Sequence, residues 1–194
     1  MYTLAWRSHR EGIPVVRPVF WSHPDLCNLW DVDDQFLLGD DILVAPVLTH
    51  GCTTREVVLP PGDWYYFWND TCYSGHRTIK IPVTLEHIPI FIRAGSILPR
   101  EISKDELDLH IYPTIDHRAF GMHYSDAGDG FDNWRVEEYR LDQSNGNIVI
   151  NRLVAGDFPF PYQTLQILVH GEAESIMWDD DQAVAIRYAS GSTL

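Results

Sequence analysis

The sequence predicts a mainly β protein, with two antiparallel β-sandwich units that follow a short αβ unit. Two observations carry this prediction. From Ile42 onward, short apolar segments alternate with turn-forming residues at regular spacing, a pattern typical of antiparallel sandwiches. Within 148–152 and 165–169, apolar and polar residues alternate as expected for strands with one buried face. The 194 residues suffice for one large domain or two small ones.

The first segment differs from the rest because it combines a helix with an apolar run. Residues 2–11 are expected to form a helix, and Gly12 stands where a C-terminal cap belongs. Residues 13–21 then form a short, nearly continuous apolar run. A strand without alternation is typical of a parallel sheet that is buried on both faces. This αβ unit would therefore need neighbours that the chain does not contain.

Two series of strands are predicted after this unit, separated by a polar joint near residues 99–105. Turn formers such as Pro60-Pro61-Gly62-Asp63 divide the first series. Its predicted strands are Ile42–Leu48, Arg55–Leu59, Trp64–Trp68, Thr78–Pro82 and Ile90–Ile92. Those of the second series are Leu107–Tyr112, Phe120–Ser125, Arg135–Leu141, Asn147–Leu153, Thr164–His170 and Ala183–Tyr188.

Composition narrows the possible partners and the cellular location. The formal net charge of -14 argues against nucleic-acid binding and against anionic lipid surfaces, while neutral sugars and cations remain compatible. No apolar run reaches the ~20 residues that a membrane span needs. Three cysteines, Cys27, Cys52 and Cys72, are odd in number and lack metal-ligand spacing. We therefore expect a cytoplasmic protein without a disulfide framework or a zinc site.

Four dense motifs occur in one order between Arg17 and Pro99, and together they closely resemble glycoside hydrolase family 31, the α-glucosidase and α-xylosidase group. The motifs are Arg-Pro-Val-Phe-Trp at 17–21, Asp-Asp-Gln-Phe-Leu-Leu-Gly-Asp-Asp-Ile-Leu-Val-Ala-Pro-Val at 33–47, Leu-Pro-Pro-Gly-Asp-Trp-Tyr-Tyr-Phe-Trp at 59–68 and the run at 87–99. A looser match covers 109–113 and 123–130, where Ala127 stands at a position usually held by Asp or Gly.

The resemblance implies a three-part architecture. In this family a (β/α)8 catalytic barrel is followed by a proximal and then a distal β-sandwich. Residues 1–41 then correspond to the last helix and strand of the barrel, 42–103 to the proximal sandwich and 104–194 to the distal one. The partner of this chain would be the missing catalytic barrel of the same polypeptide.

The resemblance also implies an activity for the parent enzyme, the hydrolysis of α-glucosides or related α-glycosides with retention. Retaining enzymes use two carboxylates roughly 5 Å apart. The family's Trp-x-Asp-Met-Asn-Glu and His-Asp-Ile-Gly-Gly strings do not occur in this sequence. No catalytic residue is therefore predicted here, and no substrate-binding residue. Arg17 and Trp21 match barrel positions and are expected to support the barrel. Whether this chain alone is an enzyme is left open, and we expect it to be inactive.

Paired aspartates near the barrel-like segment are the first candidates for chemistry. Asp33-Asp34 and Asp40-Asp41 could be an acid/base pair, but carboxylates adjacent along one chain diverge. We favour a structural role, in which Asp31, Asp33 and Asp34 cap a helix and tie the barrel to the sandwich.

A glycine-rich acidic segment is the one metal site that the sequence predicts. Asp126, Asp129 and Asp132 could supply oxygens to calcium, although the spacing is not that of an EF-hand. The alternative is a hairpin turn. Asp179–Asp181 form a second acidic cluster, for which a solvated turn is favoured over metal binding. No other cofactor is expected.

Aromatic and histidine residues leave further alternatives open. In the five consecutive aromatics at 64–68, one face is expected to fill the core, while the other packs on the barrel or stacks a sugar. His87 is expected to be a buried structural residue. For the chain as a whole, the alternatives to a family 31 C-terminal part are a stand-alone carbohydrate-binding β-sandwich and a structural or interaction module.

Overall fold

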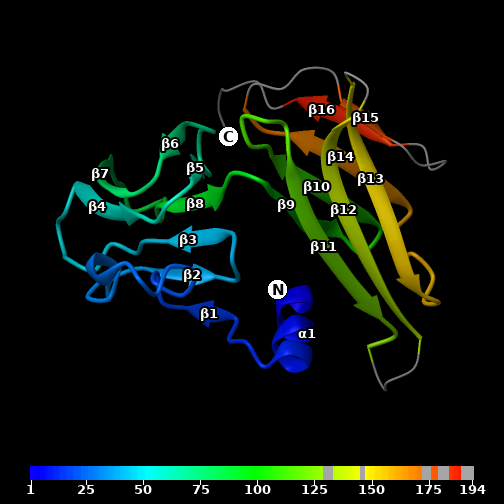
Figure 1. Cartoon of the computed structure of the whole chain (residues 1–194), viewed down its shortest axis with the longest axis horizontal. Helices are drawn as coiled ribbons and strands as arrows, with labels where there is room; N and C mark the ends of the chain where they lie inside the picture. Colours follow the sequence, from blue (N-terminus) through cyan, green and yellow to red (C-terminus); the bar gives the residue numbers. More distant parts are fainter. Residues whose placement is uncertain (129–132, 145–146, 172–175, 179–183, 189–194) are drawn as a thin grey trace. The chain divides into compact units, whose positions relative to one another are not determined.

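The chain folds into two compact units in a computed structural model that describes residues 1–128, 133–144, 147–171, 176–178 and 184–188 (Figure 1). Among the described residues, one unit consists of residues 12–94, and the other combines residues 1–11 with the chain from Gly95 to Tyr188. Strands predominate in both units, and α1 (Tyr2–Glu11) is the single α-helix among the described residues. The predicted mainly β class is confirmed.

The unit of residues 12–94 contains a six-stranded and a two-stranded sheet, and every pairing in them is antiparallel. The larger sheet has the order β1 (Val16–Arg17), β2 (Phe36–Leu38), β3 (Ile42–Val44), β8 (Ile90–Arg93), β5 (Asp63–Tyr66) and β6 (Cys72–Ser74). The smaller sheet pairs β4 (Thr54–Leu59) with β7 (Arg77–Pro82). The 3-10 helix η1 (Cys27–Leu29) lies between β1 and β2.

One hydrophobic core joins these two sheets. Val57, Leu59 and Ile81 of the smaller sheet pack in the same cluster as Leu43 and Phe91 of the larger one. The alternating burial along β4 explains this arrangement, since residues two apart share a face and that face is apolar. The unit is therefore a sandwich of two antiparallel layers, as the short strands and turns predict.

Residues 13–21 do not form the continuous parallel strand that their apolar pattern suggests. Only β1 is a strand, and it pairs antiparallel with β2. Val16 is 54% exposed whereas Arg17 is 3% exposed, so one face is buried and not both. From Pro18 onward the chain turns, with the Trp21 amide donating to the Pro18 carbonyl at 3.0 Å. Pro14 and Pro18 have no N–H to donate to a ladder, which limits the strand to the residues between them.

The second unit is built on an eight-stranded sheet together with α1 (Figure 1). Its order is β15 (Ile176–Trp178), β13 (Asn147–Gly156), β12 (Trp134–Ser144), β11 (Ala119–Asp126), β9 (Ser96–Ser103), β10 (Glu106–Tyr112), β14 (Thr164–Val169) and β16 (Ala185–Tyr188). The sheet is mixed, because β9–β10, β11–β12 and β12–β13 are antiparallel while the other pairings are parallel. Alternation along a strand predicts its buried face but not the direction of its neighbour.

One face of this sheet carries the core of the second unit. Leu107, Leu109 and Ile111 of β10 lie on it with Leu165, Ile167 and Val169 of β14, because successive odd-numbered positions point the same way. Where β11 runs beside β9, only glycine fits at position 121, since a Cβ there would lie 2.0 Å from the Ile97 carbonyl oxygen. The assignment of residues 1–41 to a barrel, and the domain boundaries that go with it, stay predictions.

Candidate functional site

The predicted calcium ligands are only partly within the described residues. Asp126 ends β11, and its carboxylate accepts hydrogen bonds from the hydroxyls of Tyr2 and Tyr124 and from the Gly128 amide, at 2.7–2.9 Å. Burial, the largest effect, raises the pKa of Asp126, but these three hydrogen bonds together lower it below its ordinary value. Asp129 and Asp132 lie outside the described residues. Calcium binding therefore stays a prediction.

No other metal centre emerges within the described part of the chain, where no three His, Cys, Asp or Glu side chains are grouped to hold an ion. The acidic cluster at 179–181 lies outside that part. Cys27, Cys52 and Cys72 are each free and exposed.

The paired aspartates do not cap a helix, so the capping prediction is wrong. The nearest helix, η1, ends before Asp31, and its N-cap is Leu26, without a side-chain cap. Asp34 forms an ion pair with Arg55 at 2.8 Å, and Asp40 forms one with Arg17. The two pairs join different segments of one unit, because a buried or half-buried guanidinium needs an anion nearby.

His87 is exposed, so the prediction that it is a buried structural residue is wrong. Its ring packs against Trp68, with the ring centroids 4.2 Å apart. The strand β5 ends at Tyr66, and Trp68 beyond it donates its indole N–H to the Ile88 carbonyl at 2.8 Å. Within β5, Trp64 and Tyr65 point to opposite faces and both are buried. The residues of this strand therefore serve packing on both faces.

A buried charged cluster in the second unit is absent from the predictions. Glu137 of β12 is fully buried, and one of its carboxylate oxygens lies 3.0 Å from both Arg135 and Arg152. The other oxygen accepts a hydrogen bond from the Tyr139 hydroxyl at 3.1 Å and lies 3.6 Å from Nδ1 of His123.

The charges around Glu137 decide its ionisation. Burial, the largest effect, raises its pKa, but the contact with His123 and the charges of Arg152 and Arg135 outweigh burial, so the pKa lies below its ordinary value. Both guanidinium groups also lie over the Phe160 ring, at 5.6 and 5.2 Å. A carboxylate held ionised and fully enclosed is not placed to act as an acid on a bound substrate, so we assign this cluster to the core.

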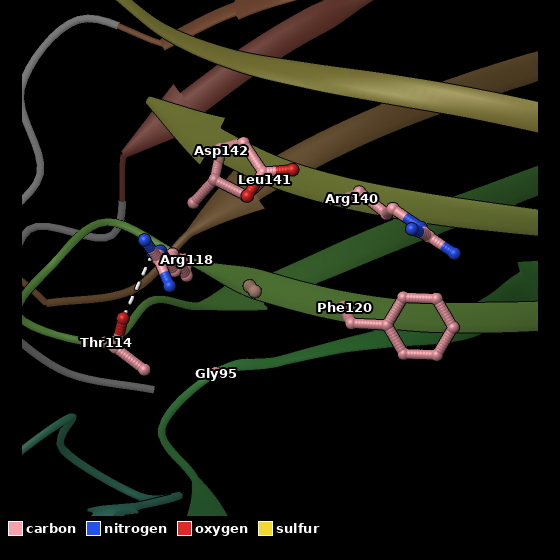
Figure 2. Close-up of a pocket in the computed structure, with 8 residues that line it drawn as sticks. Gly95, Thr114, Arg118, Phe120, Arg140, Leu141 and Asp142 are labelled. Carbon is pink, nitrogen blue, oxygen red and sulfur yellow. Dashed lines mark hydrogen bonds between the residues drawn. The ribbon is translucent and has the colours of Figure 1, made fainter. Parts of the chain in front are cut away.

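A pocket of about 460 Å³ lies beside the start of β9, at the junction of β11 and β12. Figure 2 shows Arg118 and Asp142 at one end and Phe120 with Arg140 at the other. Its remaining lining residues are Gly95, Thr114, Ala119 and Leu141. Its volume falls within the roughly 300–1,000 Å³ of small-molecule sites. None of these residues was predicted, because they come from four separate stretches of sequence.

The pocket combines exposed charge with an exposed aromatic ring. Arg118, Phe120 and Asp142 are exposed. Arg140 pairs with Glu138 at 2.8 Å and places its guanidinium 5.5 Å from the centre of the Phe120 ring. Such a surface can stack one flat apolar face and exchange several hydrogen bonds.

The comparisons with known proteins agree on one family. Residues 12–98 match the sequence profile of the glycosyl hydrolase family 31 C-terminal domain. The human neutral α-glucosidase AB is 34% identical over 185 residues, which cover 88% of this chain and 20% of that protein.

Solved structures agree with the sequence matches. A family 31 dextranase of Flavobacterium johnsoniae complexed with glucose has a TM-score of 0.69 and 30% identity, over 76% of this chain and 20% of that one. A family 31 α-xylosidase of Xanthomonas citri has a TM-score of 0.71 and 25% identity, over 99% of this chain and 20% of that one. The chain thus spans about a fifth of these relatives. It belongs to glycoside hydrolase family 31 and carries that family's C-terminal domain.

Proposed function

We propose that this chain is the C-terminal part of a retaining α-glycosidase that acts on α-glucosides or related α-glycosides. Its two β units would brace the catalytic barrel of the same polypeptide, and carbohydrate would reach the enzyme through that barrel. The observation that carries the proposal is the match of residues 12–98 to the family's C-terminal domain in a chain about a fifth as long as its relatives.

The residues themselves support a bracing role over catalysis. The family's two catalytic strings do not occur in the sequence. One aspartate of each adjacent pair, Asp34 and Asp40, forms an ion pair with an arginine, and the Glu137 side chain is fully buried. A retaining mechanism needs two carboxylates roughly 5 Å apart across a sugar-sized space, with the acid and the nucleophile both reaching the substrate.

The cellular setting is part of the proposal. No helix in the described part of the chain is both long and apolar enough to span a membrane. A cytoplasmic location is proposed from the cysteine usage alone.

The direct test is an assay of the purified 194-residue chain with p-nitrophenyl α-glucoside and α-xyloside. We expect no release of p-nitrophenol above the blank, while a complete family 31 α-glucosidase in the same buffer turns over. Circular dichroism would first establish that the chain is folded. Turnover that co-purifies with the chain would contradict the proposal.

A positive test uses a chimera. The human neutral α-glucosidase AB is truncated at the position that corresponds to Met1, and residues 1–194 of this chain are joined there, so that α1 stays with the unit that it packs in. We expect the chimera to recover α-glucosidase activity that the truncated enzyme lacks. A chimera that folds but stays as inactive as the truncation would count against a bracing role.

A further inference from the structure

We propose that the pocket around Arg118, Phe120 and Asp142 is a binding subsite for one pyranose ring of a neutral saccharide. The inference rests on the proposed function only in its choice of an α-glucan as the sugar to test. The pocket lies wholly in the unit that contains β9–β16.

Backbone hydrogen bonds fix the shape of the pocket before any ligand enters. The Gly95 amide donates to the Tyr112 carbonyl at 2.7 Å, and the Phe120 amide donates to the Gly95 carbonyl at 2.8 Å. In the turn between β10 and β11, the Thr114 amide donates to the Arg118 carbonyl at 2.9 Å, while the Arg118 amide donates to the Thr114 hydroxyl at 3.1 Å. The backbone around the pocket is therefore ordered before binding, and the entropy cost falls mainly on the exposed Arg118 and Asp142 side chains.

The strand register sets the side chains in pairs across the pocket. Phe120 of β11 lies directly opposite Arg140 of β12, and Ala119 lies opposite Leu141. Arg118 directly precedes β11, and Asp142 follows Leu141 on β12. Directly opposite side chains are about 5 Å apart at Cβ, so one bound ring can reach both members of a pair.

The charges favour a neutral polyol over an ion. In the part of the chain that the structure describes, neither the Arg118 guanidinium nor the Asp142 carboxylate has a hydrogen-bond or ion-pair partner. An anion would meet the carboxylate and a cation would meet the guanidinium. A sugar hydroxyl can donate to Asp142 and accept from Arg118, and therefore satisfies both groups.

Phe120 supplies the apolar contact. Its ring is 44% exposed, and Arg140 is held beside it by its pair with Glu138. The C–H face of a pyranose would cover exposed ring carbon and remove apolar area from water. Because the polar groups stay accessible to water, each hydrogen bond adds little net affinity, and we expect a Kd on the order of 1 mM.

The test is a titration of the ¹⁵N-labelled chain with maltotriose, followed by amide chemical shifts. We expect saturable shifts at residues 114–120 and 140–142, with the Kd raised about tenfold in Phe120→Ala. The matched control is Trp21→Ala. Trp21 is 41% exposed and has Arg17 5.8 Å from its ring, but it lies in the other unit, so this variant should bind as the wild type does.

A second titration uses inorganic phosphate to test the charge argument. The wild type should show no saturable shift at the pocket amides, whereas Asp142→Asn should bind phosphate and lose maltotriose affinity about threefold or more. Phosphate binding to the wild type, absent maltotriose shifts, or a Kd unchanged by Phe120→Ala would each overturn the proposal. Binding without hydrolysis separates this outcome from the glycosidase assays, since either result can occur without the other.

Discussion

The Tyr2 hydroxyl lies 2.7 and 2.8 Å from the two carboxylate oxygens of Asp126, which is 124 positions further along the chain. This contact fixes α1 on β11. Trp6 stacks on the Tyr124 ring at 4.8 Å, and the Thr3 hydroxyl accepts a hydrogen bond from the Tyr124 amide at 3.1 Å. The helix that opens the sequence therefore packs in the unit of β9–β16, although residues 12–94 separate the two in sequence.

Removing the Tyr2 hydroxyl should weaken this attachment. We expect Tyr2→Phe to lower the free energy of unfolding by about 1 kcal/mol, because Asp126 loses one charge-assisted hydrogen bond but stays accessible to water. Urea denaturation of both proteins measures the difference. Tyr73→Phe is the control, since the Tyr73 hydroxyl has no hydrogen-bond partner within the described residues. Equal losses in the two variants would show that Tyr2 has no special role.

Glu137 should be the most sensitive carboxylate among the described residues. We expect Glu137→Gln to destabilise the chain by about 3–5 kcal/mol, because the largely enclosed Arg135 and Arg152 would both lose the carboxylate that they share. The neighbouring Glu138→Gln is a matched control, since its pair with Arg140 is exposed and should contribute about 0.5 kcal/mol or less. Urea or thermal unfolding compares them. A loss at Glu137 as small as at Glu138 would refute the cluster's role.

The Glu137 carboxylate should also make the free energy of unfolding depend on pH. The pKa of Glu137 in the folded chain lies below its ordinary value of 4.5, so its contribution is complete above that pH and is lost as the pH falls through the folded pKa. Asp126 acts in the same direction, from an ordinary value of 3.8. Urea midpoints between about pH 7 and pH 3 should converge for the wild type and Glu137→Gln at the acid end. A difference between the two urea midpoints that grows as the pH falls would contradict a lowered pKa for Glu137.

Gly121 should tolerate no side chain. Gly121→Ala would bring a Cβ to 2.0 Å from the Ile97 carbonyl oxygen, so β9 and β11 must separate, and we expect a loss of more than about 2 kcal/mol or failure to fold. Gly51→Ala is the control. Gly51 has a φ of +77° but nothing within 4 Å of a Cβ, so backbone strain alone should cost about 1 kcal/mol. Thermal unfolding of the two variants distinguishes steric overlap from strain.

Local patterns predict the elements of this chain well. The helix at 2–11 and its Gly12 end are observed, with Gly12 at a φ of +70°. The strands around Leu107–Tyr112 and Thr164–Val169 also lie where alternation places them. These features depend on residues within one turn or one strand, and sequence spacing records such contacts directly.

The predictions that the structure contradicts failed for a common reason. The apolar run at 13–21 became a two-residue strand and a turn, and His87 became exposed. The residues of the 13–21 run suit a buried strand, and His87 stands next to an apolar stretch, but what packs against them is decided elsewhere in the chain. Hydrophobicity alone cannot tell which apolar residues find a partner.

The sequence by itself determined the β class, the turns, the family and the lack of the family's catalytic strings. Only the tertiary structure decided that α1 packs on β11, that Glu137 is enclosed by two arginines, and that Arg118, Phe120 and Asp142 share a pocket. The physical reason is strand order. A period of two tells which face a side chain takes, whereas the neighbouring strand is chosen by packing across the whole sheet, and each of these three sites joins side chains from different elements.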